Sequence, residues 1–122
     1  MGRATTALLD ADPPLAESVI SRDAAVDHLA AQVEASIVEP PATQRPVAVD
    51  LRTVLTALRM AGELERMGDL AEHIAKVARM RHPEPAIPPE LRDIVLEMGR
   101  AAERPVAKAG TCVATRDARL AA

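Results

Sequence analysis

Apolar positions recur at spacings of three and four residues along three segments of the chain. The first segment carries Leu15, Val19, Val26, Leu29, Ala30, Val33 and Ile37. The second carries a seam of Leu51, Val54, Leu55, Leu58 and Ala61, continued on a shifted face by Leu64, Met67, Ala71, Ile74 and Ala78. The third carries Leu91, Ile94, Val95, Met98 and Ala102. Such spacing places apolar side chains on one face of a helix, so the pattern predicts three amphipathic helices.

Prolines set the predicted helix ends. Asp12 can cap a helix that starts at Pro13, because proline in the first turn loses no hydrogen bond. Pro105 is expected to kink or interrupt the third helix. With connectors at 39–46 and 81–89, the helices are predicted at about 13–38, 47–80 and 89–115. The predicted fold is all-α, an antiparallel up-down-up helical bundle.

Composition changes this picture in one respect. The 122 residues are 48% hydrophobic without a single aromatic side chain, which suits helices packed closely through small and aliphatic residues. Two glycines, Gly62 and Gly68, interrupt the second helix at a cost of about 1 kcal/mol each relative to alanine. They predict either a close helix approach or a local bend.

Charge and motif content exclude several functions. The net charge is −3 with no basic block, and there is no aromatic ring for base stacking, which argues against nucleic-acid binding. Cys112 is the only cysteine, as expected in a reducing compartment. No apolar run approaches the roughly 20 residues of a membrane span. Neither a glycine-rich phosphate loop nor a nucleophile elbow occurs, so we expect a cytoplasmic protein that is not an enzyme.

Two pairs of acidic residues at four-residue spacing are the candidate chemistry. Glu65 and Asp69 lie one turn apart on the second helix, as do Asp23 and Asp27 on the first. Antiparallel helices could bring these two stripes face to face. Four carboxylates would make a hard oxygen site, suited to Mg, Mn or Fe ions. His73 extends one stripe by a turn and is a further possible ligand.

The alternative is that these acids form a solvated helix face, which spacing alone favours. Glu34, Glu63 and Glu72 are expected to face water in either case. His28 and His82 are expected on the surface.

A short internal repeat is visible when residues 7–16 are laid over residues 112–121. Both segments have an apolar pair, then Asp12 or Asp117, then Leu-Ala three residues later.

Several separated motifs resemble the PhoU family. The segments 46–52, 64–71 and 74–76 resemble its signature, and residues 7–9, Asp12, 15–20 and Asp23 match the preceding helix in order and spacing. The resemblance implies a spectrin-repeat-like three-helix bundle, found twice in PhoU proteins. It also implies a bacterial, cytoplasmic negative regulator of phosphate-starvation signalling and phosphate uptake. Its implied partners are the phosphate transporter ATPase subunit and a sensor histidine kinase.

Family members can carry metal on paired (E/D)xxxD motifs. In this chain the resemblance places those motifs on Glu65 with Asp69 and on Asp23 with Asp27. The implied cofactor is a divalent or iron-type ion: Mg, Mn, Fe or Zn.

Compared with the family, we expect a single domain over residues 1–122. It would hold a partial first repeat, about 4–80, with only the last turns of its first helix, and the first helix of a second repeat, about 89–115. The 89–115 helix could cover the apolar surface that a longer first helix would bury, or the exposed seam could drive homodimerisation. The alternative function is a structural helical interaction module, a degenerate family fragment without metal or signalling role.

Overall fold

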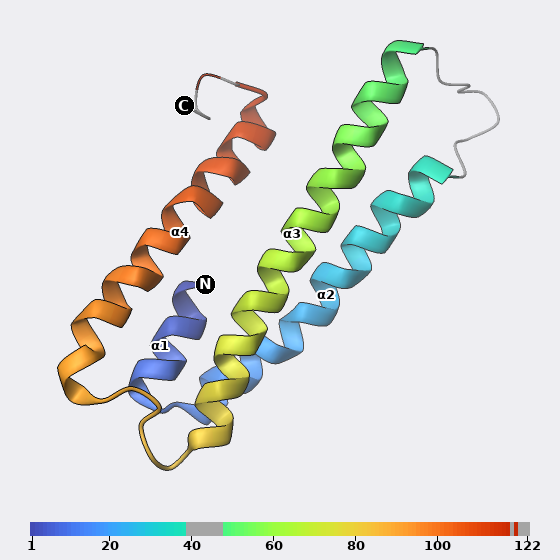
Figure 1. Ribbon diagram of the computed structural model, residues 1–122. Coiled ribbons are helices and arrows are strands. Elements are labelled where there is room, and N and C mark those ends of the chain that lie inside the picture. The colour runs from blue at the N-terminus through green and yellow to red at the C-terminus, as the bar shows by residue number, and fades with distance from the viewer. Residues whose placement is uncertain (39–47, 118, 120–122) are drawn as a thin grey trace.

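The computed structural model describes residues 1–38, 48–117 and 119 of the chain. Its elements are α1 (Gly2–Asp10), α2 (Pro13–Val38), α3 (Ala48–Arg81), a 3-10 turn η1 (Pro89–Leu91) and α4 (Arg92–Thr115) (Figure 1). Over these residues there is no strand, which confirms the all-α fold. In the same part of the chain, none of the helices has the length and apolar character needed to cross a membrane.

The helix ends follow the local sequence signals. The backbone N–H of Leu15 donates to Oδ1 of Asp12 at 3.0 Å, so Asp12 caps α2 as predicted. The three predicted helices occur within about three residues of their expected bounds. Pro105 does not interrupt α4, which runs through it, so of the two expected outcomes, a kink or an interruption, the interruption was wrong. Pro105 and Ala101 are both exposed, and water can reach the Ala101 carbonyl that lacks its N–H partner.

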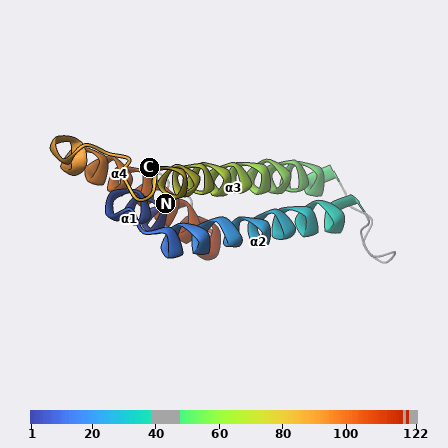
Figure 2. The ribbon, with the colours of Figure 1, turned by 90° about the horizontal axis from the view of Figure 1, so that it is seen from below.

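The helices pack in an antiparallel arrangement. Successive helices run in opposite directions, and α2 and α3 lie alongside each other in two perpendicular views (Figures 1 and 2). The short α1 lies at one end of the molecule, where it contacts α2, α3 and α4.

Small residues form the core around α1. The buried apolar residues are Ala4, Ala7, Leu8, Leu9, Ala16, Ala61, Ala71, Ala75 and Ala78. A Cβ added to Gly99 of α4 would lie 2.5 Å from Oγ1 of Thr5 on α1, so the Thr5 side chain packs directly against the backbone of α4 at that point. Backbones come close because the contacting side chains are small, as the aromatic-free composition predicted.

The helix α4 contacts α1 and η1, and among the described residues none of its Cα atoms lies within 8 Å of a Cα atom of α3. Leu51 and Leu55 of the apolar seam of α3 are 60% and 49% exposed, so α4 does not cover that part of the seam. At the base of the molecule, α1 lies between α3 and α4 and contacts both (Figure 1).

The internal repeat has a structural counterpart. The helix α1 ends at Ala11, in the left-handed conformation with φ 49°, and Asp12 follows. The helix α4 ends at Arg116, also left-handed with φ 55°, and Asp117 follows. The two aligned segments therefore end a helix in the same way, with a left-handed residue before the aspartate.

Candidate metal site

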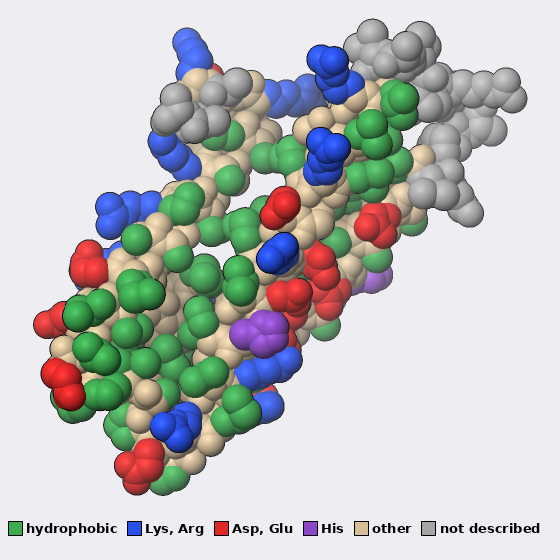
Figure 3. Space-filling view, in the orientation of Figure 1, with side chains coloured by type: hydrophobic (Ala, Val, Ile, Leu, Met, Phe, Trp, Pro, Cys, Tyr) green, Lys and Arg blue, Asp and Glu red, His purple; other side chains and the backbone are tan. Residues whose placement is uncertain are grey.

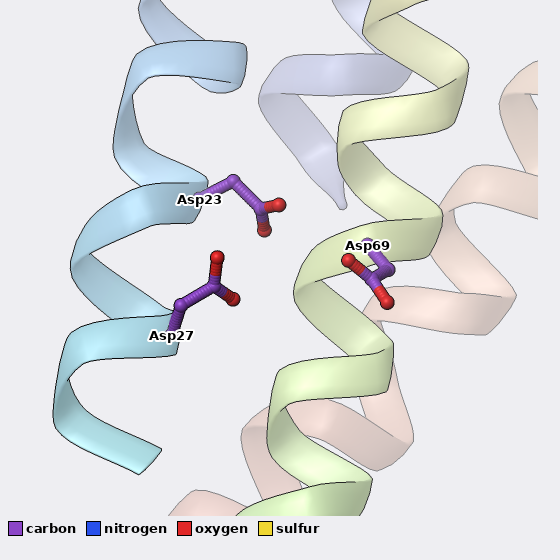
Figure 4. Close-up of side chains that lie close together, drawn as sticks. All are labelled: Asp23, Asp27 and Asp69. Carbon is purple, nitrogen blue, oxygen red and sulfur yellow. The ribbon is translucent and has the colours of Figure 1, made fainter. Parts of the chain in front are cut away.

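Three carboxylates meet where α2 and α3 face each other. Asp23 and Asp27 lie one turn apart on α2, and Asp69 lies opposite on α3 (Figure 4). One oxygen from each lies within 4.8 Å of the others. The antiparallel packing of α2 and α3 thus brings the two predicted acidic stripes together.

Glu65 does not join this cluster. It lies one turn before Asp69 on α3 and is half-buried, but it is outside the group of carboxylates within 4.8 Å. His73, the weaker candidate, is exposed and also outside the group. His28 and His82 are exposed, as predicted.

Asp23 is the most constrained member of the cluster. Its Oδ1 is buried and has no hydrogen-bond partner. A Cβ added to Gly68 would lie 2.7 Å from this oxygen. Glycine at position 68 therefore leaves room for the Asp23 carboxylate, and the expected close helix approach is confirmed there. Gly62 has no atom within 4 Å of an added Cβ, so close approach does not explain it.

The electrostatics of the site are unfavourable for a bare carboxylate. Burial raises the pKa of Asp23 above its ordinary value of 3.8, and the negative charges of Asp27, Glu72 and Asp69 raise it further. The ammonium group of Lys76 lowers this pKa in part. The cluster holds an excess of negative charge that a cation would offset.

Glu72 is the residue that sequence reasoning missed. It was expected to face water, but it is half-buried and forms an ion pair with Lys76, so that expectation was wrong. It lies three residues after Asp69, on the side of α3 that faces α2. The signal that could have found it is Lys76, four residues later, since Glu and Lys at this spacing pair on a helix.

A cavity of about 270 Å³ opens beside the cluster. Asp23 and Gly68 line it together with Met1, Arg3 and Arg22. Asp23 therefore lies at the wall of an open cavity.

The fold and the site define a helical protein with a carboxylate cluster between two antiparallel helices. Comparison with known proteins identifies its family. Residues 1–78 match the PhoU domain, and the chain belongs to the PhoU family. It is 49% identical over 102 residues to the phosphate-specific transport system accessory protein PhoU homolog 2 of Mycobacterium tuberculosis, covering 84% of this chain and 48% of the relative. Against PhoU homolog 1 of Mycobacterium leprae it is 43% identical over 122 residues, covering all of this chain and 55% of the relative.

A more distant relative, the PhoU homolog of Aquifex aeolicus, is 37% identical over 101 residues, covering 79% of this chain and 46% of the relative. The chain thus spans about half the length of the curated relatives it matches. No solved structure matches it.

Proposed function

We propose that this chain is a non-enzymatic cytoplasmic regulator that represses phosphate-starvation signalling and restrains phosphate uptake. It would act by contacts with the ATPase subunit of a phosphate transporter and with a sensor histidine kinase. Membership of the PhoU family supports this proposal. So do the names of its relatives, which are accessory proteins of phosphate-specific transport systems.

The proposed function includes a metal ion on the acidic face. The carrying observation is the buried, unpartnered Oδ1 of Asp23, held against Gly68 and beside two further carboxylates. Asp23, Asp27 and Asp69 would hold the ion, with Glu65 as a fourth ligand from the adjacent turn. An all-oxygen donor set suits Mg, Mn or Fe better than Zn, which more often takes nitrogen or sulfur ligands.

A bound cation would supply charge compensation between α2 and α3. Without it, the carboxylates repel one another across the helix contact, and the raised pKa of Asp23 reflects this repulsion together with burial. With it, the two helices would be cross-linked at the middle of their contact. The ion would therefore fix the surface that α2 and α3 present to a partner.

Metal binding tests this proposal directly. Mn, Fe(II) and Zn would be titrated by calorimetry into the purified chain with Mg in excess, alongside an Asp23→Asn/Asp69→Asn variant. A matched control is Glu34→Gln/Glu63→Gln, which removes two exposed acids from the same two helices. We expect saturable binding by the wild type and the control, and at least a tenfold weaker affinity in the Asp23/Asp69 variant.

Equal binding by all three proteins, or no binding by any of them, would contradict the site. A Glu65→Gln variant then tests the fourth ligand, since the affinity of this variant for metal falls only if Glu65 contributes an oxygen.

Binding of the purified transporter ATPase subunit and of the kinase cytoplasmic region, measured with and without metal, tests the regulatory role. Absence of both metal and partner binding would favour the alternative, a helical interaction module.

A further inference from the structure

An ion pair on α3 lies beside the carboxylate cluster. Nζ of Lys76 donates to Oε2 of Glu72, one turn earlier on the same helix, at 2.5 Å. The Glu72 side chain is 16% exposed and that of Lys76 is 38% exposed. The carboxylate of the pair is therefore largely buried, while its lysine is within easier reach of water.

Both members of the pair act electrostatically on Asp23 of α2. Burial is the largest cause of the raised pKa of Asp23, and the negative charges of Asp27, Glu72 and Asp69 raise it further, in that order. The positive charge of Lys76 lowers the same pKa. Glu72 thus acts on Asp23 more strongly than Asp69 does, although Asp69 belongs to the cluster. The ion pair is therefore part of the electrostatics of the site.

Lys76 is the cation that compensates some of this negative charge. Among the described residues, it is the only one whose positive charge lowers the pKa of Asp23. Arg3 and Arg22 line the cavity next to Asp23, but the buried Oδ1 of Asp23 accepts a hydrogen bond from neither of them. Arg3 instead donates to Oγ of Ser18 at 2.9 Å. The compensation therefore comes from the lysine on α3.

The two side chains of the pair differ in how freely they can move away. A lysine ammonium is a compact charge on a flexible four-carbon stem, and the more exposed Lys76 can swing it into water. Glu72 has a shorter stem and is held among buried groups. A divalent ion that enters the cluster repels the ammonium group and attracts the carboxylate. The expected response is that Lys76 leaves and Glu72 stays.

We propose that Lys76 is the resident counter-cation of the carboxylate cluster and that a divalent ion displaces it from Glu72. In the metal-free chain, the lysine offsets part of the negative charge between α2 and α3. When the ion binds, it takes over this role and the ammonium group moves into solvent. Lys76 thereby sets the affinity of the metal site proposed above, on which this exchange rests. The residues involved all come from α2 and α3, within the part of the chain that matches the PhoU domain.

Three variants of the pair change the charge beside the cluster in different directions. Lys76→Met removes the competing cation and leaves Glu72 unpaired, so the site gains a negative charge. Glu72→Gln leaves the lysine uncompensated, so the site gains a positive charge. The double variant keeps the net charge of the wild-type pair. Methionine and glutamine form helices about as well as the residues they replace, so α3 is preserved in each variant.

Arg79→Met is the matched control. Arg79 lies three residues after Lys76 on α3, and its Nη1 donates to Oε1 of Glu17 on α2 at 3.0 Å. It too is a cation paired with a glutamate, but it is not among the described charges that shift the pKa of Asp23. The same substitution at this position therefore removes a positive charge from α3 and leaves the cluster unchanged.

The measurement is the affinity for Mn(II) by calorimetry at neutral pH and low ionic strength, with helix content by circular dichroism for each variant. We expect Lys76→Met to bind Mn(II) about tenfold more tightly than the wild type, and Glu72→Gln to bind it about tenfold more weakly, because each adds one unit of charge near a divalent ion. The double variant and Arg79→Met should stay within about twofold of the wild type, because neither changes the net charge at the cluster.

A second readout uses the metal-free proteins. In buffer with a chelator, Lys76→Met should melt at a lower temperature than Arg79→Met, because only Lys76→Met leaves the carboxylates between α2 and α3 without their counter-cation. Saturating Mn(II) should reverse this order, since the ion binds Lys76→Met more tightly.

The outcomes separate the exchange from the metal site itself. Wild-type affinity in Lys76→Met or in Glu72→Gln would overturn the exchange and leave the metal site standing. Binding by Lys76→Met but not by the wild type would support the exchange, and the metal part of the proposed function would fail because the lysine keeps the ion out. Absence of binding by every variant would overturn both.

Discussion

The two halves of α3 differ in which apolar side chains they bury. In the second half the buried residues are the small ones, with Ala75 fully buried and Ala71 and Ala78 nearly so. In the first half the large apolar residues Leu51 and Leu55 are 60% and 49% exposed. Large apolar side chains are exposed on both halves, since Leu70 and Met80 of the second half are 51% and 70% exposed, but the run of buried alanines lies in the second half.

The difference is explained by the number of neighbouring helices. Only the second half of α3 contacts α1 as well as α2, and at that end three helices enclose a core. The first half has α2 on one side and, on the other, an apolar groove lined by Met60 and Leu64 of α3 and Val113 of α4 (Figure 3). Burial here depends on the third helix, and close approach of three backbones requires small side chains.

The largest expected effect comes from exchanging the residue types of the two halves. Ala75→Leu inserts three carbons into a closed core, and overpacking of this kind costs about 1–3 kcal/mol of unfolding free energy. Leu51→Ala removes three carbons from an exposed site, where changes usually stay within about 0.5 kcal/mol. Urea denaturation of both variants measures the contrast. Equal losses would mean that the two halves are packed alike in solution.

Substitutions of the two glycines of α3 are expected to change the unfolding free energy by an intermediate amount. Gly62→Ala should raise the unfolding free energy by up to about 1 kcal/mol, because alanine is the better helix former and its Cβ meets nothing. Gly68→Ala should gain little or nothing, because its Cβ displaces the Asp23 carboxylate from a rotamer, at about 0.5–1.5 kcal/mol. Thermal denaturation of the pair measures this difference. A gain in Gly68→Ala equal to that in Gly62→Ala would show that Asp23 does not pack against position 68.

The smallest effect is the pH dependence of Asp23. Its raised pKa means that the folded state binds the proton more tightly than the unfolded state. Protonation therefore stabilises the fold below the ordinary value of 3.8, and this contribution is lost as pH rises through the higher folded pKa. Asp23→Asn should be more stable than the wild type at pH 7 in metal-free buffer, by less than about 1 kcal/mol because the site is partly open to solvent.

That advantage should shrink as the pH falls toward 3.8. Melting temperatures at several pH values follow it, with Glu34→Gln as the control that changes charge on the exposed face of α2. A wild type more stable than Asp23→Asn at pH 7 without metal would contradict the raised pKa.

Much of the fold was predictable because its signals are local. Asp12 and Pro13 specify the start of α2 through a cap and a fixed backbone angle, whatever the helix packs against. The four-residue spacing of Asp23 and Asp27 places both on one face of any helix. The expectation for Gly68 also held, since a glycine inside a strong helical pattern often marks close packing.

Other features depend on distances between helices, which spacing does not contain. Glu65 and Glu72 are both acidic and both half-buried on α3, yet only Glu72 is among the charges that raise the pKa of Asp23. Whether α4 would cover α3 depended on the distance between these two helices. Pro105 remained inside α4 because its surroundings are open, which is a property of the packed molecule.

The sequence by itself determined the helices, their caps, the acidic stripes and the repeat, because each arises from interactions within a few residues along the chain. Only the tertiary structure decided which acids meet, which glycine admits a carboxylate, and which apolar residues stay uncovered. Those outcomes are set by the contact of α2 with α3 and by the position of α1 between α3 and α4, and both are relations between segments that lie far apart in the sequence.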